Sequence, residues 1–158
     1  MMKSFLKGFV YAGAGILRVL QERNMRVHIC IAGYMFYFLC LKDFFFLTKT
    51  QAALLCVMCA VVLSLECVNT AVESVVDLVT TQKHPMAKKA KDAAAGAVLT
   101  AAVFSVAVGI ILLWQPQAFK AMYCYYTAHP VRLTILLLSI AASLCAVFGI
   151  KSKQKRAE

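Results

Sequence analysis

The sequence predicts an all-α integral membrane protein, and three observations support this prediction. Of its 158 residues, 62% are hydrophobic, and the mean hydropathy of +0.77 exceeds what a soluble domain of this length can bury. Long apolar runs recur along the chain and are separated by short polar connections. Lysine and arginine, 17 in total, gather in alternate connections, as they do on the cytoplasmic side of membrane proteins.

Residues 1–21 predict an amino-terminal amphipathic surface helix. Polar residues interrupt this run too often for a membrane span or for the apolar core of a typical signal peptide. Lys3, Lys7 and Arg18 lie on a narrow basic stripe opposite a broad apolar face. Such a helix lies in the cytoplasmic leaflet with its apolar face in the lipid. Glu22, the one acid among the first forty residues, follows directly.

Four apolar segments are long enough, with their flanks, to cross a bilayer as helices. They cover residues 27–47, 52–79, 93–114 and 131–150. Lys42 and Asp43 interrupt the first segment and are expected to mark its far interface. His28, near the inner end of the same segment, is expected to be a partnered helix residue rather than a ligand.

Polar connections separate the later spans. Residues 80–91 contain Pro85, which excludes a continuous straight helix at that point. Residues 115–130 are expected to form a loop or an interfacial segment, and a basic tail follows the last span at 151–158. The seven cysteines lie mostly inside apolar runs, where cysteine behaves as a small hydrophobic residue, so we expect free thiols.

The distribution of positive charge predicts the topology. Residues 1–26 hold five lysines and arginines, residues 80–92 hold four, and the tail holds four, which gives thirteen against four in the other connections. The positive-inside rule therefore puts both termini and the 80–92 connection in the cytoplasm. On a membrane protein such a basic surplus indicates anionic lipid headgroups, and we do not expect nucleic acid as a partner.

The most informative stretch is 66–77, which reads E-C-V-N-T-A-V-E-S-V-V-D. At about 100° per residue, its polar side chains share one helix face. They are Glu66, Asn69, Thr70, Glu73 and Asp77. Each carboxylate costs on the order of 3 kcal/mol to insert near the middle of a bilayer, so this face is expected to meet protein, water or a metal ion.

This acidic face and the lysines of the 80–92 connection fall near the same side of the membrane. Acids beside lysines at a lipid interface suit a phosphate ligand with a divalent cation. The soluble nucleotide-binding signatures, such as G-x-x-x-x-G-K-[ST], are absent from the sequence. Residue chemistry therefore leaves three hypotheses open: a phosphoryl-transfer enzyme, a small proton-coupled exporter, or a non-catalytic membrane scaffold.

The stretch 66–77, followed by H-P at 84–85 and K-K-A-K-D-A-A-A-G-A-V-L at 88–99, resembles the small bacterial diacylglycerol kinase and undecaprenol kinase family. The resemblance covers roughly residues 4–114, including E-R-N-M-R at 22–26. It implies a homotrimeric, three-span enzyme of the bacterial cell membrane that transfers the γ-phosphate of MgATP to a lipid hydroxyl. The implied kinase domain is residues 1–117. Residues 118–158, with the additional carboxy-terminal fourth span, depart from the short family members.

The resemblance also implies roles for individual residues. Glu66 matches the catalytic base and Asn69 a neighbouring active-site residue, while Glu22 and Glu73 match the pair that holds Mg²⁺. Positions matching nucleotide contacts are Tyr11, Glu22, Glu73, Asp77, Gln82, Lys83, His84, Lys91 and Asp92. Asp77 either orients the nucleotide or pairs with a lysine.

The acceptor lipid is less well defined by the sequence. The N-T-A-x-E and H-P-x-A-K-x-A-K-D spellings look more like the Gram-positive undecaprenol kinases than the proteobacterial diacylglycerol kinases. Both acceptors are long lipids with one reactive hydroxyl at the interface. Residue chemistry alone does not separate undecaprenol from diacylglycerol.

Overall fold

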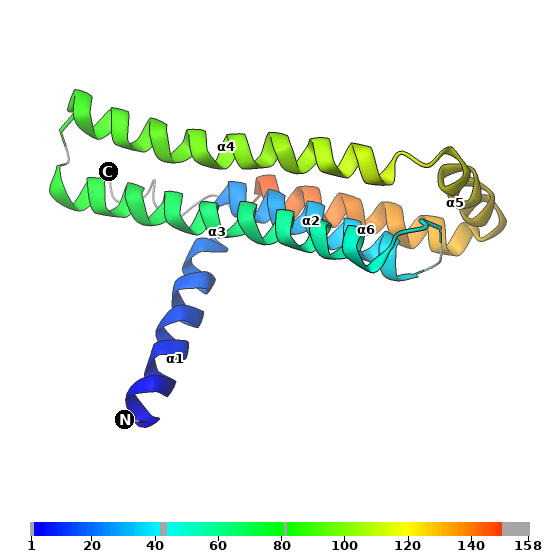
Figure 1. Cartoon of the computed structure of the whole chain (residues 1–158), viewed down its shortest axis with the longest axis horizontal. Helices are drawn as coiled ribbons and strands as arrows, with labels where there is room; N and C mark the ends of the chain where they lie inside the picture. The colour runs from blue at the N-terminus through cyan, green and yellow to red at the C-terminus, as the bar shows by residue number, and fades with distance from the viewer. Residues whose placement is uncertain (1, 42–43, 81, 150–158) are drawn as a thin grey trace.

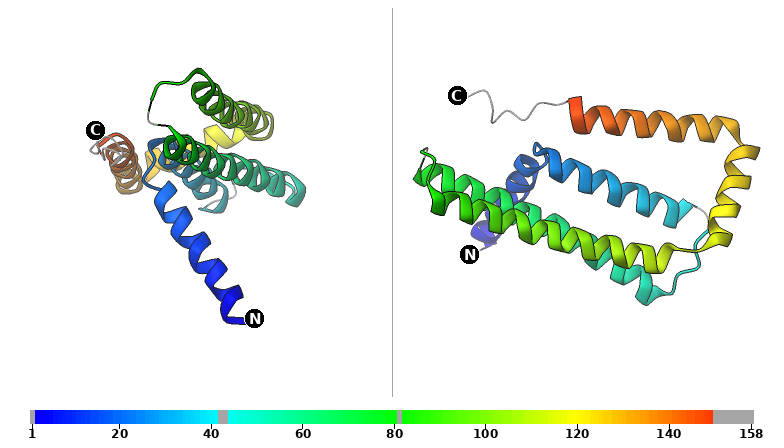
Figure 2. Two further views of the ribbon diagram at one scale, coloured as in Figure 1. Left: turned by 90° about the vertical axis from the view of Figure 1, so that its left-hand side faces the viewer. Right: turned by 90° about the horizontal axis from the view of Figure 1, so that it is seen from above.

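The computed structural model of the chain describes residues 2–41, 44–80 and 82–149, and every regular element in these ranges is a helix. Four helices run side by side as a bundle: α2 (Arg23–Leu41), α3 (Lys49–Val79), α4 (Pro85–Leu113) and α6 (Pro130–Gly149) (Figure 1). Two further helices lie across the bundle direction: α1 (Met2–Val19), which leaves where α2 begins, and α5 (Pro116–Ala128), which joins α4 to α6 at the opposite end (Figure 2). The all-α prediction is confirmed.

Local sequence signals fix where the two longest helices begin. Thr48 caps α3 in a capping box: its side chain accepts from the Gln51 backbone N–H, and the Gln51 side chain accepts from the Thr48 backbone N–H. With no glycine or proline inside it, α3 continues to Val79, as the sequence predicted. At the start of α4, Pro85 occupies the first turn and His84 Nδ1 accepts from the Met86 N–H at 3.2 Å.

Two predicted boundaries differ from the structure. The first span was expected to reach residue 47, but α2 ends at Leu41 and residues 44–48 are not helical. The polar connection was expected to reach residue 91, yet α4 starts at Pro85, because proline suits the first turn of a helix as well as it ends one. Residues 115–130 were expected to form a loop or an interfacial segment, and 116–128 of them form the helix α5. Lys42 and Asp43, which were expected to mark an interface, lie outside the described residues, as do residue 150 and the basic tail.

Three helices of the described chain are long and apolar enough to cross a membrane: α3, α4 and α6. Their side chains are mostly exposed in the single chain, as expected of surfaces that face lipid or other helices. The helix α2 is not among the three, since Arg23, Asn24, Arg26 and His28 make its first turns polar. All seven cysteines are free, as predicted.

The hairpin of α3 and α4 projects well beyond the ends of α2 and α6 on the side of the 80–84 connection (Figures 1 and 2). On the other side of α2 lies α6. The Tyr34 hydroxyl of α2 lies 3.2 Å from Ser139 Oγ and 2.9 Å from Ser143 Oγ, both on α6. Within the bundle, Glu66 on the acidic face of α3 meets His28 of α2, and toward the end of the hairpin Asp77 on the same face meets Lys91 of α4. This arrangement divides the face into a buried and an open part.

Candidate active site

The buried part of the α3 face begins with Glu66 and Asn69, which are only 2% and 6% exposed. They are the buried polar residues of the described chain. The nearby hydroxyl of Thr70 donates to the Glu66 carbonyl at 3.0 Å and is thereby satisfied within its own helix. A buried carboxylate needs a partner, because an uncompensated charge in an apolar setting is costly.

His28 of α2 is the side chain that meets this carboxylate. Its Nε2 lies 3.3 Å from Glu66 Oε1 across the α2–α3 interface. The expectation that His28 is a partnered helix residue is confirmed. The sequence did not identify Glu66 as its partner, because the two residues are 38 positions apart and belong to different helices.

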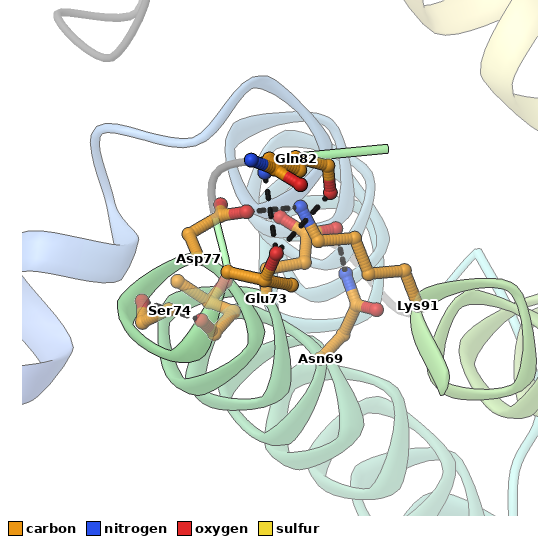
Figure 3. A network of polar contacts seen from close by, with 8 residues as sticks. Asn69, Glu73, Ser74, Asp77, Gln82 and Lys91 are labelled. Atoms are coloured by element: carbon orange, nitrogen blue, oxygen red, sulfur yellow. Dashed lines mark hydrogen bonds and ion pairs between the residues drawn. The ribbon is translucent and has the colours of Figure 1, made fainter. Parts of the chain in front are cut away.

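Asn69 holds the next carboxylate along the helix, Glu73. Its Nδ2 donates to Glu73 Oε1 at 3.1 Å, one helical turn away (Figure 3). Its Oδ1 is buried and has no hydrogen-bond partner in the described chain. Buried acceptors are rarely left without a donor, so this oxygen points to a ligand that the chain alone does not supply.

Glu22 lies in the short turn between α1 and α2. Its charge and that of Glu73 both act on the Glu66 carboxylate, so three acids from two parts of the chain share one electrostatic neighbourhood. Within the described ranges, no three His, Cys, Asp or Glu side chains converge as a metal site on their own.

The open part of the face lies where the α3–α4 hairpin projects beyond the other helices. Lys91 of α4 donates to Asp77 of α3 at 2.5 Å, and this pair closes one wall of a cleft of about 580 Å³ (Figure 3). The residues lining the cleft include Asp77, Gln82, Lys83, His84, Lys88, Lys91 and Asp92. Its size suits a nucleotide-sized ligand, and its lysines suit an anion.

The residues predicted as nucleotide contacts thus separate into groups. Six of them line the cleft: Asp77, Gln82, Lys83, His84, Lys91 and Asp92. Glu22 and Glu73 belong instead to the acidic neighbourhood of Glu66. Tyr11 lies on α1, is 70% exposed, and does not line the cleft. The sequence missed Lys88 as a lining residue, although its spacing of three from Lys91 puts both on one helix face.

Apolar helices that hold a buried carboxylate near a lysine-lined cleft suit a membrane enzyme that acts on a phosphate compound. The chain belongs to the prokaryotic diacylglycerol kinase family, whose model matches residues 10–113. The match ends with the last residue of α4, so α5 and α6 lie outside it. Membership makes the chain a membrane lipid kinase, and the exporter and scaffold hypotheses are set aside.

Two curated relatives carry related names. The chain is 38% identical over 112 residues to the undecaprenol kinase of Bacillus subtilis, an alignment covering 70% of this chain and 89% of that protein. It is 40% identical over 115 residues to the diacylglycerol kinase of Synechocystis sp., covering 72% of this chain and 64% of that protein. No solved structure was found to match the chain.

Proposed function

We propose that the chain transfers the γ-phosphate of MgATP to the hydroxyl of a membrane lipid, undecaprenol or diacylglycerol, at the cytoplasmic interface. The observation that carries this proposal is the continuity of the α3 face. It runs from the buried Glu66 and Asn69, through Glu73, to Asp77 at the lysine-lined cleft. A lipid hydroxyl at the buried end and a nucleotide at the open end would meet along one helix.

At the buried end, Glu66 acts as the general base. As the lipid oxygen forms its bond to the γ-phosphorus, the bond from that phosphorus to the bridging oxygen of ADP breaks, and the hydroxyl proton passes to the Glu66 carboxylate. Asn69, three residues further along the same buried face, is a neighbouring active-site residue. The low exposure of both residues keeps water from competing for the phosphoryl group.

Glu22 and Glu73 are the residues that would hold magnesium. Mg²⁺ is typically bound by one or two carboxylates together with substrate phosphates, so two carboxylates from this chain would be enough to hold it. The orphaned Asn69 Oδ1 next to Glu73 supplies a further hard oxygen, and Asn69 Nδ2 fixes the Glu73 carboxylate. When bound, the metal would neutralise charge on the phosphates and orient them.

At the open end, the lysines and polar groups of the cleft bind the nucleotide. Lys83 and Lys91 offer ammonium donors to its phosphates, and Gln82, His84 and Asp92 offer polar groups to the rest of it. Asp77 keeps the Lys91 side chain in place. Tyr11 would join these contacts only if α1 of this chain or of another copy came closer to the cleft.

The domain boundaries, the oligomeric state and the membrane topology complete the proposal. Residues 1–117 are the kinase domain, which assembles as a homotrimer, and residues 118–158 are an addition to it. The apolar side chains of α1 are exposed, as suits a surface helix in the cytoplasmic leaflet. With α2 as a fourth crossing helix, both termini and the 80–84 connection face the cytoplasm.

The acceptor is tested by measuring transfer of labelled γ-phosphate to undecaprenol, diacylglycerol and ceramide in mixed micelles. We expect a labelled phospholipid from undecaprenol or diacylglycerol, dependent on both ATP and magnesium. Ceramide is the comparison acceptor of different chemistry. Absence of labelled lipid from every acceptor, with a folded protein, would contradict the proposed function.

A further inference from the structure

The contact between His28 and Glu66 carries an inference about how the catalytic carboxylate is held. Glu66 is 2% exposed, and the side chain of His28 is 22% exposed, so the pair is largely shielded from solvent. The two residues lie on different helices, and His28 Nε2 is 3.3 Å from Glu66 Oε1. The pair therefore spans the α2–α3 interface at the buried end of the site.

The geometry has two physical consequences. A glutamate side chain has three rotatable bonds, so a carboxylate without a fixed partner would sample several positions. A ring N–H that donates to Oε1 restricts these positions and also offsets part of the cost of burying the charge. It engages one carboxylate oxygen and leaves Oε2 able to accept a proton.

We propose that His28 is a positioning residue for Glu66, donating from Nε2 to Oε1 so that Oε2 faces the acceptor hydroxyl. This inference rests on the proposed function, in which Glu66 is the base. It goes beyond that function by naming the residue that aims the base. Because His28 lies on α2, six residues after Glu22, one short segment then supplies both an acid and the orientation of the base.

The test compares substitutions that keep or remove the donor. In His28→Gln, the side-chain amide can reach roughly where Nε2 lies, whereas His28→Leu is apolar and of similar size. His129→Leu, at the end of α5 on the far side of the bundle, is the matched control for loss of a histidine. Each purified full-length variant is assayed for kcat and for the KM for ATP, with thermal unfolding measured in parallel.

We expect His28→Leu to lower kcat by about tenfold or more, since small displacements of a catalytic group have effects of this size or larger. The KM for ATP stays within about twofold, because the cleft is built from other residues, and a twofold change is under 0.5 kcal/mol of binding. His28→Gln recovers a substantial part of the lost kcat, and His129→Leu behaves as wild type. In a Glu66→Gln background, His28→Leu causes no further loss.

Several results would overturn the proposal. One is a folded His28→Leu enzyme with wild-type kcat, and another is a kcat in His28→Gln no higher than in His28→Leu. If His28→Leu does not fold, it is replaced by His28→Asn, because the asparagine amide is too short to reach Glu66. Equal kcat values in His28→Asn and His28→Gln would then overturn the proposal. The Glu66→Gln variant separates failure of the proposed function from failure of the positioning role. Full activity of Glu66→Gln refutes Glu66 as the base. An inactive Glu66→Gln together with wild-type activity of His28→Leu refutes only the positioning role of His28.

Discussion

Lys91 on α4 lies 2.5 Å from the carboxylate of Asp77 on α3, and this ion pair joins the two helices of the hairpin. The side chains are 36% and 50% exposed. Ion pairs this exposed contribute at most about 1 kcal/mol to stability. The pair therefore matters mainly for where it holds the Lys91 ammonium, at the wall of the cleft.

The first prediction separates the two roles considered for Asp77. Lys91→Met should raise the KM for ATP by about tenfold or more, because one phosphate contact is lost. Asp77→Asn should raise it less, because Lys91 remains but is no longer held in place. Both KM values come from steady-state assays at saturating lipid. A larger effect for Asp77→Asn than for Lys91→Met would show that Asp77 contacts the nucleotide itself.

The second prediction concerns magnesium. If Glu22 and Glu73 share the ion, Glu22→Gln removes one of two carboxylate ligands and should raise the magnesium concentration needed for half-maximal rate by about tenfold. The control is Asp77→Asn, which lies at the cleft and should leave this requirement near the wild-type value. The measurement is a magnesium titration of lipid phosphorylation at fixed ATP. An unchanged requirement in Glu22→Gln would remove Glu22 from the metal site.

The third prediction concerns α6, which lies outside the family match and contains no acid, amide or histidine. A chain truncated after Gln117 should keep its lipid kinase activity, because every proposed site residue precedes α5. It should also unfold at lower temperature, because the contacts between α6 and α2 are lost. One of these is the hydrogen bond that Arg26 Nη2 of α2 donates to the Val147 carbonyl of α6 at 3.3 Å.

A milder variant isolates the polar contacts between α2 and α6. Replacing Ser139 and Ser143 together by alanine removes both partners of the Tyr34 hydroxyl and should lower stability by about 1 kcal/mol, with kcat unchanged. Thermal unfolding in detergent gives the stability and a lipid phosphorylation assay gives kcat. A folded truncated chain without activity toward any lipid would show that residues after Gln117 belong to the site.

The sequence predicted most of the fold because hydrophobic periodicity and charge are local signals. The continuity of α3 from Lys49 to Val79 follows from an apolar run without glycine or proline, and its acidic face follows from helical spacing. The start of α4 differed because proline has two structural uses. Pro85 was taken to mark the middle of a connection, and in the structure it opens α4.

The site was predictable along one helix but not between helices. Spacing alone put Glu66, Asn69 and Glu73 together, since they lie on successive turns of α3. The pairing of Glu66 with His28 depends on how α2 packs against α3, and the pairing of Asp77 with Lys91 depends on the geometry of the hairpin. No periodic pattern within either segment encodes such contacts. The family resemblance was needed to choose a kinase over an exporter or a scaffold.

If the acidic face of α3 catalyses phosphoryl transfer to a lipid, activity depends on its carboxylates Glu66 and Glu73. Labelled γ-phosphate transfer to the best acceptor is measured for wild type, Glu66→Gln and Glu73→Gln, each purified and checked for folding. Both variants should fold but lose activity by about a hundredfold or more, the usual contribution of a general base or of a metal ligand. Near wild-type rates in both folded variants would contradict it.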